Sequence, residues 1–224
     1  MEWHTCAHEY HLTDNVKVSM NASYQEHRKG NTNHGHISKL LLSSVLAGCC
    51  IGIGGTVYLK VGGVAGAVLF SIGLITVVCY KLKLYTGAAG FVTRSNIGEL
   101  LPILLGNIIG CVLLSLLPTK VDASAIIATR AACEWYNAFF LAIGCGVLMT
   151  IAVTFAREDK WLPLLFAVPA FILCGFYHCV ADAFFYAVGW EHLSTDVISV
   201  YLATVAGNFV GCNLPRLAAI ANAQ

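Results

Sequence analysis

The residues with the clearest chemical potential are His178 and Asp182, in the apolar stretch from Pro169 to Trp190. An imidazole and a carboxylate are costly at membrane depth unless they face a cavity or a partner, so they indicate a conduction or binding site. A second apolar run begins at Gly63 and breaks into the charged, glycine-rich sequence KLKLYTGAAG, from Lys81 to Gly90. Two interrupted apolar segments in matching halves of a chain are typical of a transport site.

The composition shows what kind of protein must position these residues. Of 224 residues, 58% are hydrophobic and only 11% are charged, which is too few polar side chains to cover a soluble globule. We therefore expect an all-α membrane protein surrounded by a lipid bilayer. The formal net charge of +1 and the absence of a basic run with interleaved aromatics argue against a nucleic-acid partner.

The ten cysteines do not suggest a disulfide framework or a metal site, because eight of them lie in apolar segments, where free cysteine packs as a small hydrophobe. Cys174, His178 and Cys179 lack a second ligand pair at zinc-like spacing. Near the N-terminus, solvated side chains are the preferred interpretation over a transition-metal site for His4, Cys6, His8 and His11. We expect no cofactor.

Hydropathy divides the chain into two parts. Residues 1–38 are polar, lack the apolar core of a signal peptide, and predict a mostly flexible or short-helical cytoplasmic tail. Residues 39–220 predict a domain of six transmembrane helices, of which the second and fifth are broken. The expected segments are 40–59, 63–94, 100–117, 136–155, 161–190 and 197–214.

The distribution of basic residues predicts the orientation. The basic residues expected on one side of the membrane are Lys17, Arg28, Lys29, Lys39, Arg94, Arg157, Lys160 and Arg216. Those expected on the other side are Lys60, Lys120 and Arg130. Because cytoplasmic loops carry the excess of Lys and Arg, both termini are expected in the cytoplasm, with the protein in the plasma or inner membrane.

An internal repeat indicates two halves, at about 39–118 and 128–220. The sequence GNIIGC at 106–111 is echoed by GNFVGC at 207–212, and the same offset pairs Phe70 with Phe171. Because each half has three helices, the second must enter from the opposite face, which predicts an inverted 3+3 repeat with its site at the midplane. Asn107 and Asn208 are expected to clamp the exposed backbone of the broken segments rather than to touch the solute.

Three motifs together resemble the formate/nitrite transporter family: KLKLYTGAAG after FSIGL, GFYHCVADAFF after PAF, and the paired GN-x-x-G helices. The hallmarks of that family are an (L)(F/Y)TG loop and a GF-x-H-S-(V/I)-A-N stretch. The resemblance covers about residues 38–220 and implies an aquaporin-like protomer within a homopentamer. It further implies one pore per protomer for small monovalent weak-acid anions, formate or nitrite first, with hydrosulfide, acetate or lactate as alternatives.

The resemblance also assigns site residues. It places the central histidine at His178, the loop threonine at Thr86, and a basic residue of the external entrance, usually lysine, at Arg130. Apolar constrictions are expected at Phe70, Leu74, Phe171, Phe176, Leu84 and Tyr85. Three positions depart from the family pattern, because Gly146 and Asp182 each replace an asparagine and Cys179 replaces a serine. Of these, Asp182 and Cys179 are expected to tune the pore.

The physical chemistry of an apolar throat predicts that a proton accompanies the anion. A bare anion pays a desolvation penalty on the order of tens of kcal/mol, whereas the neutral acid pays only a few. Arg130 outside and Lys160 inside would gather anions, with help from Lys81 and Lys83 if these face the pore. Burial favours a mainly neutral His178, and a cationic imidazole paired with Asp182 is the alternative.

Two other classes of protein are alternatives to an anion transporter. An aquaporin-like channel for neutral solutes shares the inverted repeat, but the chain has no Asn-Pro-Ala turn. An intramembrane enzyme using His178, Asp182 or Cys179 would need a second catalytic cluster, and no HExxH, GxSxG or P-loop pattern is present. The sequence therefore favours a transporter over an enzyme.

Overall fold

The computed structural model describes the backbone of residues 14–221 and the side chains of residues 35–218. The chain divides into two compact units, residues 1–39 and 40–224. The described residues form helices and contain no strand. The N-terminal candidates His4, Cys6, His8 and His11 lie outside the described residues.

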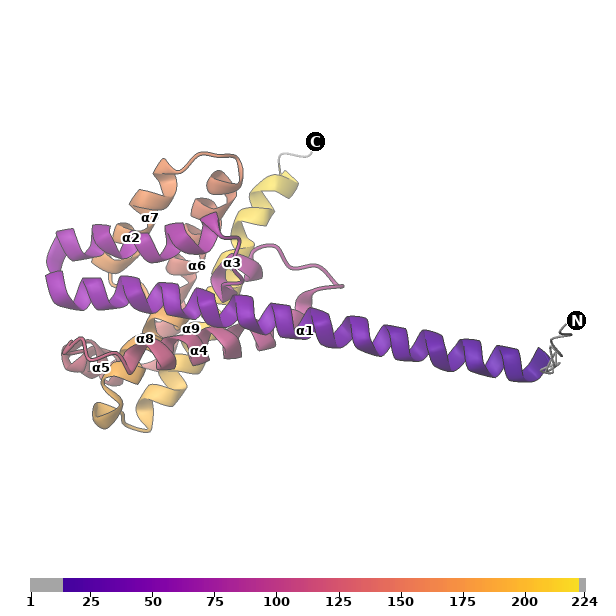
Figure 1. Cartoon of the computed structure of the whole chain (residues 1–224). Helices are drawn as coiled ribbons and strands as arrows, with labels where there is room; N and C mark the ends of the chain where they lie inside the picture. Colours follow the sequence, from indigo (N-terminus) through magenta and orange to yellow (C-terminus); the bar gives the residue numbers. More distant parts are fainter. Residues whose placement is uncertain (1–13, 222–224) are drawn as a thin grey trace, which may run out of the picture. The chain divides into compact units, whose positions relative to one another are not determined.

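Nine α-helices follow one another along the described part of the chain, as labelled in Figure 1. They are α1 (Asp14–Val61), α2 (Gly63–Cys79), α3 (Tyr85–Ala89), α4 (Leu100–Ser115), α5 (Ser124–Ala131), α6 (Trp135–Arg157), α7 (Leu162–Leu173), α8 (Cys179–Val188) and α9 (Asp196–Ala221). Two 3₁₀ turns, Ile97–Glu99 and Trp190–His192, precede α4 and α9. Because α1 begins at Asp14, residues 14–38 are helical, where the sequence led us to expect a flexible or short-helical tail.

Four helices among the described residues are long and apolar enough to cross a membrane: Gly35–Val61, Ile97–Ser115, Trp135–Arg157 and Asp196–Ala218. The two remaining apolar segments are each divided into a pair of shorter helices, α2 with α3 and α7 with α8. The breaks follow Cys79 and Leu173, inside the segments that the sequence predicts to be interrupted.

Both interruptions have the same backbone geometry. Lys81 and Gly175 adopt left-handed φ angles of 53° and 70°. The next amide in each break donates back into the preceding helix, from Leu82 to the carbonyl of Val77 and from Phe176 to the carbonyl of Phe171, both at 2.9 Å. This is the Schellman motif, in which a left-handed residue ends a helix. The internal repeat therefore includes the C-terminal caps of α2 and α7.

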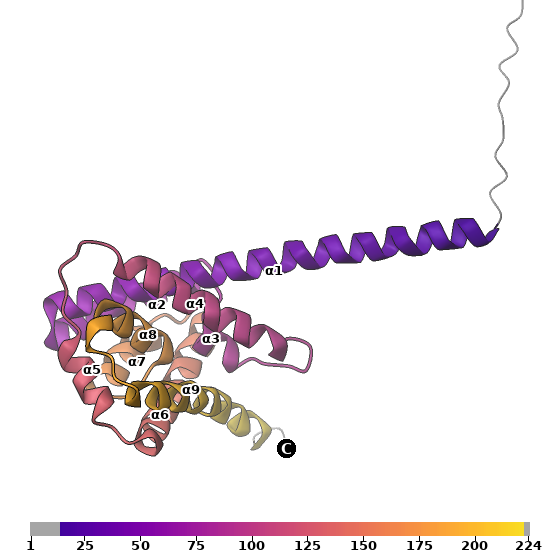
Figure 2. The same ribbon diagram turned by 90° about the horizontal axis from the view of Figure 1, so that it is seen from below.

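Glycines set the helix crossings that surround the breaks. A Cβ at Gly110 of α4 would overlap the carbonyl oxygen of Val45 in α1, and a Cβ at Gly211 of α9 would overlap that of Ile143 in α6. These helices pack with their backbones in contact, as small residues allow in membrane proteins. The helix α3 contacts α4, α6 and α9, while α8 contacts α4, α5 and α9, so both short helices lie within the bundle (Figure 2).

Candidate functional site

The centre of the site is a hydrogen bond between the two interrupted segments. Oγ1 of Thr86, in the first turn of α3, lies 3.1 Å from Nε2 of His178, the N-cap residue of α8. Thr86 is fully buried and His178 is 3% exposed. The ring of Phe171 stacks on the imidazole at 5.5 Å between centroids. The pair is thus a polar contact enclosed by apolar side chains.

The backbone of α8 determines which nitrogen of His178 carries the proton. The N–H of Ala181 donates to Nδ1 of the imidazole at 3.1 Å. An acceptor nitrogen cannot itself bear a proton, so the ring is neutral in this arrangement and its proton sits on Nε2. Nε2 then donates to Oγ1 of Thr86, which leaves the threonine hydroxyl proton available to another acceptor.

Two buried asparagines hold the breaks open in the same manner. Asn107 accepts the N–H of Tyr85 through Oδ1 at 2.8 Å, and Asn208 accepts that of Cys179 at 2.9 Å. Each amide group donates to two carbonyls, those of Ser44 and Lys83 from Asn107 and those of Ala142 and Tyr177 from Asn208. Backbone polar groups released by a break must be satisfied internally at membrane depth, and these side chains do so.

Two cysteines connect the halves of the repeat. Sγ of Cys212 in α9 contacts the carbonyl of Thr86 at 3.2 Å, while Sγ of Cys111 in α4 contacts that of Val180 at 3.3 Å. Each thiol therefore binds the short helix of the opposite half. Both cysteines are fully buried, as small side chains within the helix packing.

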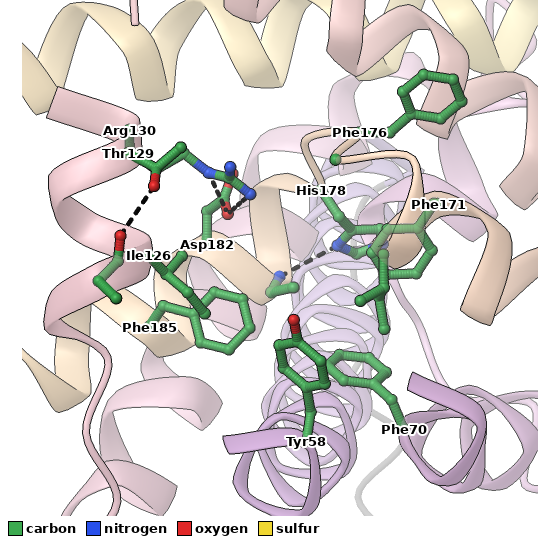
Figure 3. A pocket seen from close by; sticks show the side chains of 14 residues that line it. Tyr58, Phe70, Ile126, Thr129, Arg130, Phe171, Phe176, His178, Asp182 and Phe185 are labelled. Carbon is green, nitrogen blue, oxygen red and sulfur yellow. Dashed lines mark hydrogen bonds and ion pairs between the residues drawn. The ribbon is translucent and has the colours of Figure 1, made fainter. Parts of the chain in front are cut away.

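A cavity of about 250 Å³ lies beside His178 (Figure 3). We name it the Arg130 cavity, and its lining includes Tyr58, Phe70, Arg130, Phe171, Phe176, His178, Asp182 and Phe185. The rings of Phe70 and Phe171 meet edge to face, 6.0 Å between centroids. Both aromatics lie with His178 in the lining of this cavity.

Arg130 and Asp182 form an ion pair in this cavity. Nε and Nη2 of Arg130, on α5, both lie 3.1 Å from Oδ1 of Asp182, on α8. The guanidinium carbon also lies over the ring of Tyr177, 3.5 Å from its centroid. Asp182 therefore pairs with Arg130 and not with His178, so the alternative of a cationic His178 balanced by Asp182 has no support in this geometry.

A second cavity, of about 670 Å³, is lined by Leu74 and Leu84. We name it the Lys83 cavity after its basic lining residues, which are Lys81, Lys83 and Arg157; Asp159 is also part of the lining. The sequence missed Arg157 and selected Lys160 instead. The structure places Lys160 outside this lining, in an exposed pair with Glu158 at 2.8 Å. The turn after α6 directs the two basic side chains to different places.

The expected constriction residues divide between the two cavities. Phe70, Phe171 and Phe176 line the Arg130 cavity, and Leu74 and Leu84 line the Lys83 cavity. Tyr85 lines neither of them. Its hydroxyl donates to the carbonyl of Val205 in α9 at 3.3 Å, so its ring points into the helix packing. Tyr58, which the sequence did not single out, completes the aromatic lining beside Phe70, at 6.5 Å between ring centroids.

Gly146 and Cys179, which depart from the family pattern, both lie in tightly packed surroundings. A Cβ at Gly146 would lie 2.5 Å from the carbonyl oxygen of Asn208, so α6 and α9 approach too closely for a side chain there. The backbone N–H of Cys179 donates to Oδ1 of Asn208, and the thiol of Cys179 is fully buried. Neither position contributes to the lining of the two cavities.

Comparisons with known proteins find similar transporters and channels. A family model described as "Formate/nitrite transporter" matches residues 18–216. A "Probable formate transporter" of Methanothermobacter thermautotrophicus is 26% identical over 239 aligned positions, which cover 79% of this chain and 87% of the relative. The "Formate channel FocA" of Haemophilus influenzae is 24% identical over 193 positions, which cover 69% and 68%. None of these relatives is described as an enzyme.

Solved structures share the fold. A chain described as "FNT family ion channel" superposes with a TM-score of 0.73 at 20% identity, covering 93% of this chain and 98% of the other. A "Pentameric formate channel with formate bound" gives a TM-score of 0.72 at 22% identity, with coverage of 83% and 96%. At these identities the likeness concerns the fold.

Proposed function

Because the chain belongs to the formate/nitrite transporter family, we propose that it carries small monovalent weak-acid anions across a membrane, with formate or nitrite as the first candidates. The formate channels and transporters among its relatives support the choice of formate. Hydrosulfide, acetate and lactate remain alternative solutes for the same pathway.

The observation that carries this proposal is the position of the Thr86–His178 pair. His178 lines the Arg130 cavity, and Gly87, the residue after Thr86, lines the Lys83 cavity. The side chains expected at the constrictions, among them Phe70, Phe171 and Leu74, are apolar. In this proposal the solute exchanges hydrogen bonds with the Thr86–His178 pair as it passes from one cavity to the other.

The energetics favour passage as the neutral acid. Removing the hydration shell of an anion between Phe70, Phe171 and Leu74 costs far more than removing that of the protonated acid. A neutral His178 with its proton on Nε2 does not compensate the charge of an anion. It does orient Thr86, whose hydroxyl proton is free to bind the carbonyl oxygen of formic acid or the N=O oxygen of nitrous acid. The proton therefore travels with the anion.

The repeat supports a six-span architecture. In this proposal the second crossing consists of α2 and α3, and the fifth consists of α7 and α8. The two halves insert in opposite directions. The equivalent Schellman ends and the equivalent asparagine clamps support this inverted 3+3 arrangement. A homopentamer in the plasma or inner membrane, with both termini in the cytoplasm, completes the proposal. Its supports are the pentameric structural relative and the positions of the basic residues.

Reconstitution tests the proposal directly. Purified protein is placed in liposomes, and initial rates of formate and glycerol uptake are compared with those of empty liposomes. We expect protein-dependent uptake of formate and none of glycerol. Uptake of glycerol without formate would instead favour an aquaporin-like channel for neutral solutes, and the weak-acid proposal would fail.

A further inference from the structure

Arg130 and Asp182 are buried partners rather than independent charges. The side chain of Arg130 is 12% exposed and that of Asp182 only 1%. Both guanidinium contacts, from Nε and from Nη2, reach the same carboxylate oxygen, Oδ1, at 3.1 Å. A pair held this closely in a site of low dielectric acts on its surroundings as a dipole and not as a cation.

The Arg130–Asp182 pair supplies the charges of the Arg130 cavity, as far as the described residues show. Among the described residues that line it, Arg130 and Asp182 are the only Lys, Arg, Asp or Glu, and His178 is neutral in the observed arrangement. The basic residue that the sequence led us to expect as an anion attractor is therefore neutralised. The lining charges of this cavity sum to zero.

The second carboxylate oxygen of Asp182, Oδ2, lacks a hydrogen-bond partner among the described residues. This oxygen is buried, although Asp182 belongs to the cavity lining. An unpaired carboxylate oxygen is expensive to bury, so a site that contains one favours an occupant with a hydrogen-bond donor. Water and a protonated acid both carry such a donor, whereas a carboxylate anion does not.

We propose that the Arg130 cavity is a selectivity site for the protonated acid, in which Asp182 cancels the charge of Arg130 and offers Oδ2 to the O–H of the solute. This inference rests on the weak-acid transport proposed above. The acid forms from the anion and a proton of the bulk solution, and no bond other than this O–H is made or broken. Discrimination between anion and acid then begins at the cavity, before the solute reaches His178.

A double-mutant cycle tests the charge compensation. Asp182→Asn leaves the cation of Arg130 unbalanced, so we expect the KM for formate to fall about 5- to 10-fold and to become sensitive to salt, since a focused positive charge concentrates anions. The combination Arg130→Gln with Asp182→Asn restores neutrality, and its salt dependence should return to that of the wild type. Arg130→Lys keeps both charges and serves as the matched control, with the salt dependence of the wild type.

The outcomes separate the two proposals. If wild-type protein takes up no formate, the transport function itself is wrong. If the wild type transports formate but its KM already rises steeply with salt, the cavity is not neutral and the present inference is overturned. An Asp182→Asn protein with unchanged KM and salt dependence would overturn it as well. Size-exclusion profiles and thermal unfolding of each variant establish that the compared proteins are folded.

A neutral analogue tests the recognition of a donor. Formamide matches formic acid in size and carries N–H donors without a charge. We expect it to inhibit formate uptake by the wild type and to do so about fivefold more weakly in Asp182→Asn, because a hydrogen bond to a carboxylate is about twice as strong as one to a neutral amide. Dimethylformamide lacks an N–H and should inhibit neither protein. Equal inhibition of both proteins by formamide would contradict the role of Oδ2.

Discussion

Oγ1 of Thr86 and Nε2 of His178 lie 3.1 Å apart although 92 positions separate them in the chain. Each residue stands at the beginning of a short helix that follows a break, Thr86 in α3 and His178 at the N-cap of α8. Continuous helices would not present these two termini to each other. The interruptions of the two segments are therefore what creates the central contact.

Removal of the threonine hydroxyl should impair transport. In Thr86→Val the proton on Nε2 of His178 loses its acceptor and the solute loses a donor. We expect formate uptake to fall about 5- to 10-fold, since a lost hydrogen bond is worth about 1–1.5 kcal/mol. Thr86→Ser keeps the hydroxyl and should retain most of the activity. Initial uptake rates in proteoliposomes measure both. Wild-type rates in Thr86→Val would remove this residue from the pathway.

The asparagine clamps should be required for stability. Asn208→Ala leaves the buried amide of Cys179 without its acceptor, and we expect a loss of about 2–4 kcal/mol. Asn213→Ala provides the control within the same helix, because Asn213 is half-buried and its loss leaves no break unsupported. Thermal unfolding in detergent should show a much larger decrease in Tm for Asn208→Ala. Equal decreases would mean that the clamp contributes nothing specific.

The two Schellman ends should respond in opposite directions to substitution. Lys81 adopts a left-handed conformation, which is unfavourable for a residue with a Cβ. Lys81→Gly should therefore stabilise the protein by about 0.5–1 kcal/mol. Gly175 has no Cβ, and Gly175→Ala should destabilise it by about 1–2 kcal/mol. The Tm of each variant against the wild type gives the sign. A lower Tm for Lys81→Gly, with an unchanged one for Gly175→Ala, would refute the shared geometry.

Restoring the asparagine of the family pattern at Gly146 should disturb the packing of α6 on α9. A Cβ there would meet the carbonyl oxygen of Asn208, so we expect Gly146→Asn to cost about 1–3 kcal/mol. Gly87→Ala is the matched control, because its Cβ would make only ordinary contacts, at 3.9 Å from Leu84 and Val153. Yield and thermal unfolding of the two variants are compared. Equal stability of Gly146→Asn and the wild type would show that the crossing has room for a side chain.

Much of the fold could be predicted because its signals are local in the sequence. The family resemblance drawn from three motifs is confirmed by the match over residues 18–216, and the all-helical membrane fold by the solved structures. The loss of apolar character after Cys79 indicates the first break, and the repeated GN-x-x-G sequence identifies the two asparagines that satisfy the breaks. These features depend on residue type and spacing alone.

Other features depend on directions in space that the sequence does not encode locally. Tyr85 follows the break directly, yet its ring points to α9, because a five-residue helix offers each side chain a different neighbour. The pairing of Arg130 with Asp182 joins two helices across 52 positions. The choice between Arg157 and Lys160 depends on a turn in which Asp159 takes a left-handed φ of 60°.

The most direct measurement records formate and proton entry together, in proteoliposomes that contain a pH-sensitive dye. With wild-type protein we expect internal acidification to accompany formate uptake, about one proton per formate. The rate should fall as the external pH rises from about 5 to 8, because the protonated fraction of the acid falls. His178→Phe should lower the rate of uptake at every pH. Formate entry without acidification, or a wild-type rate of uptake in His178→Phe, would contradict proton-linked passage through the central pair.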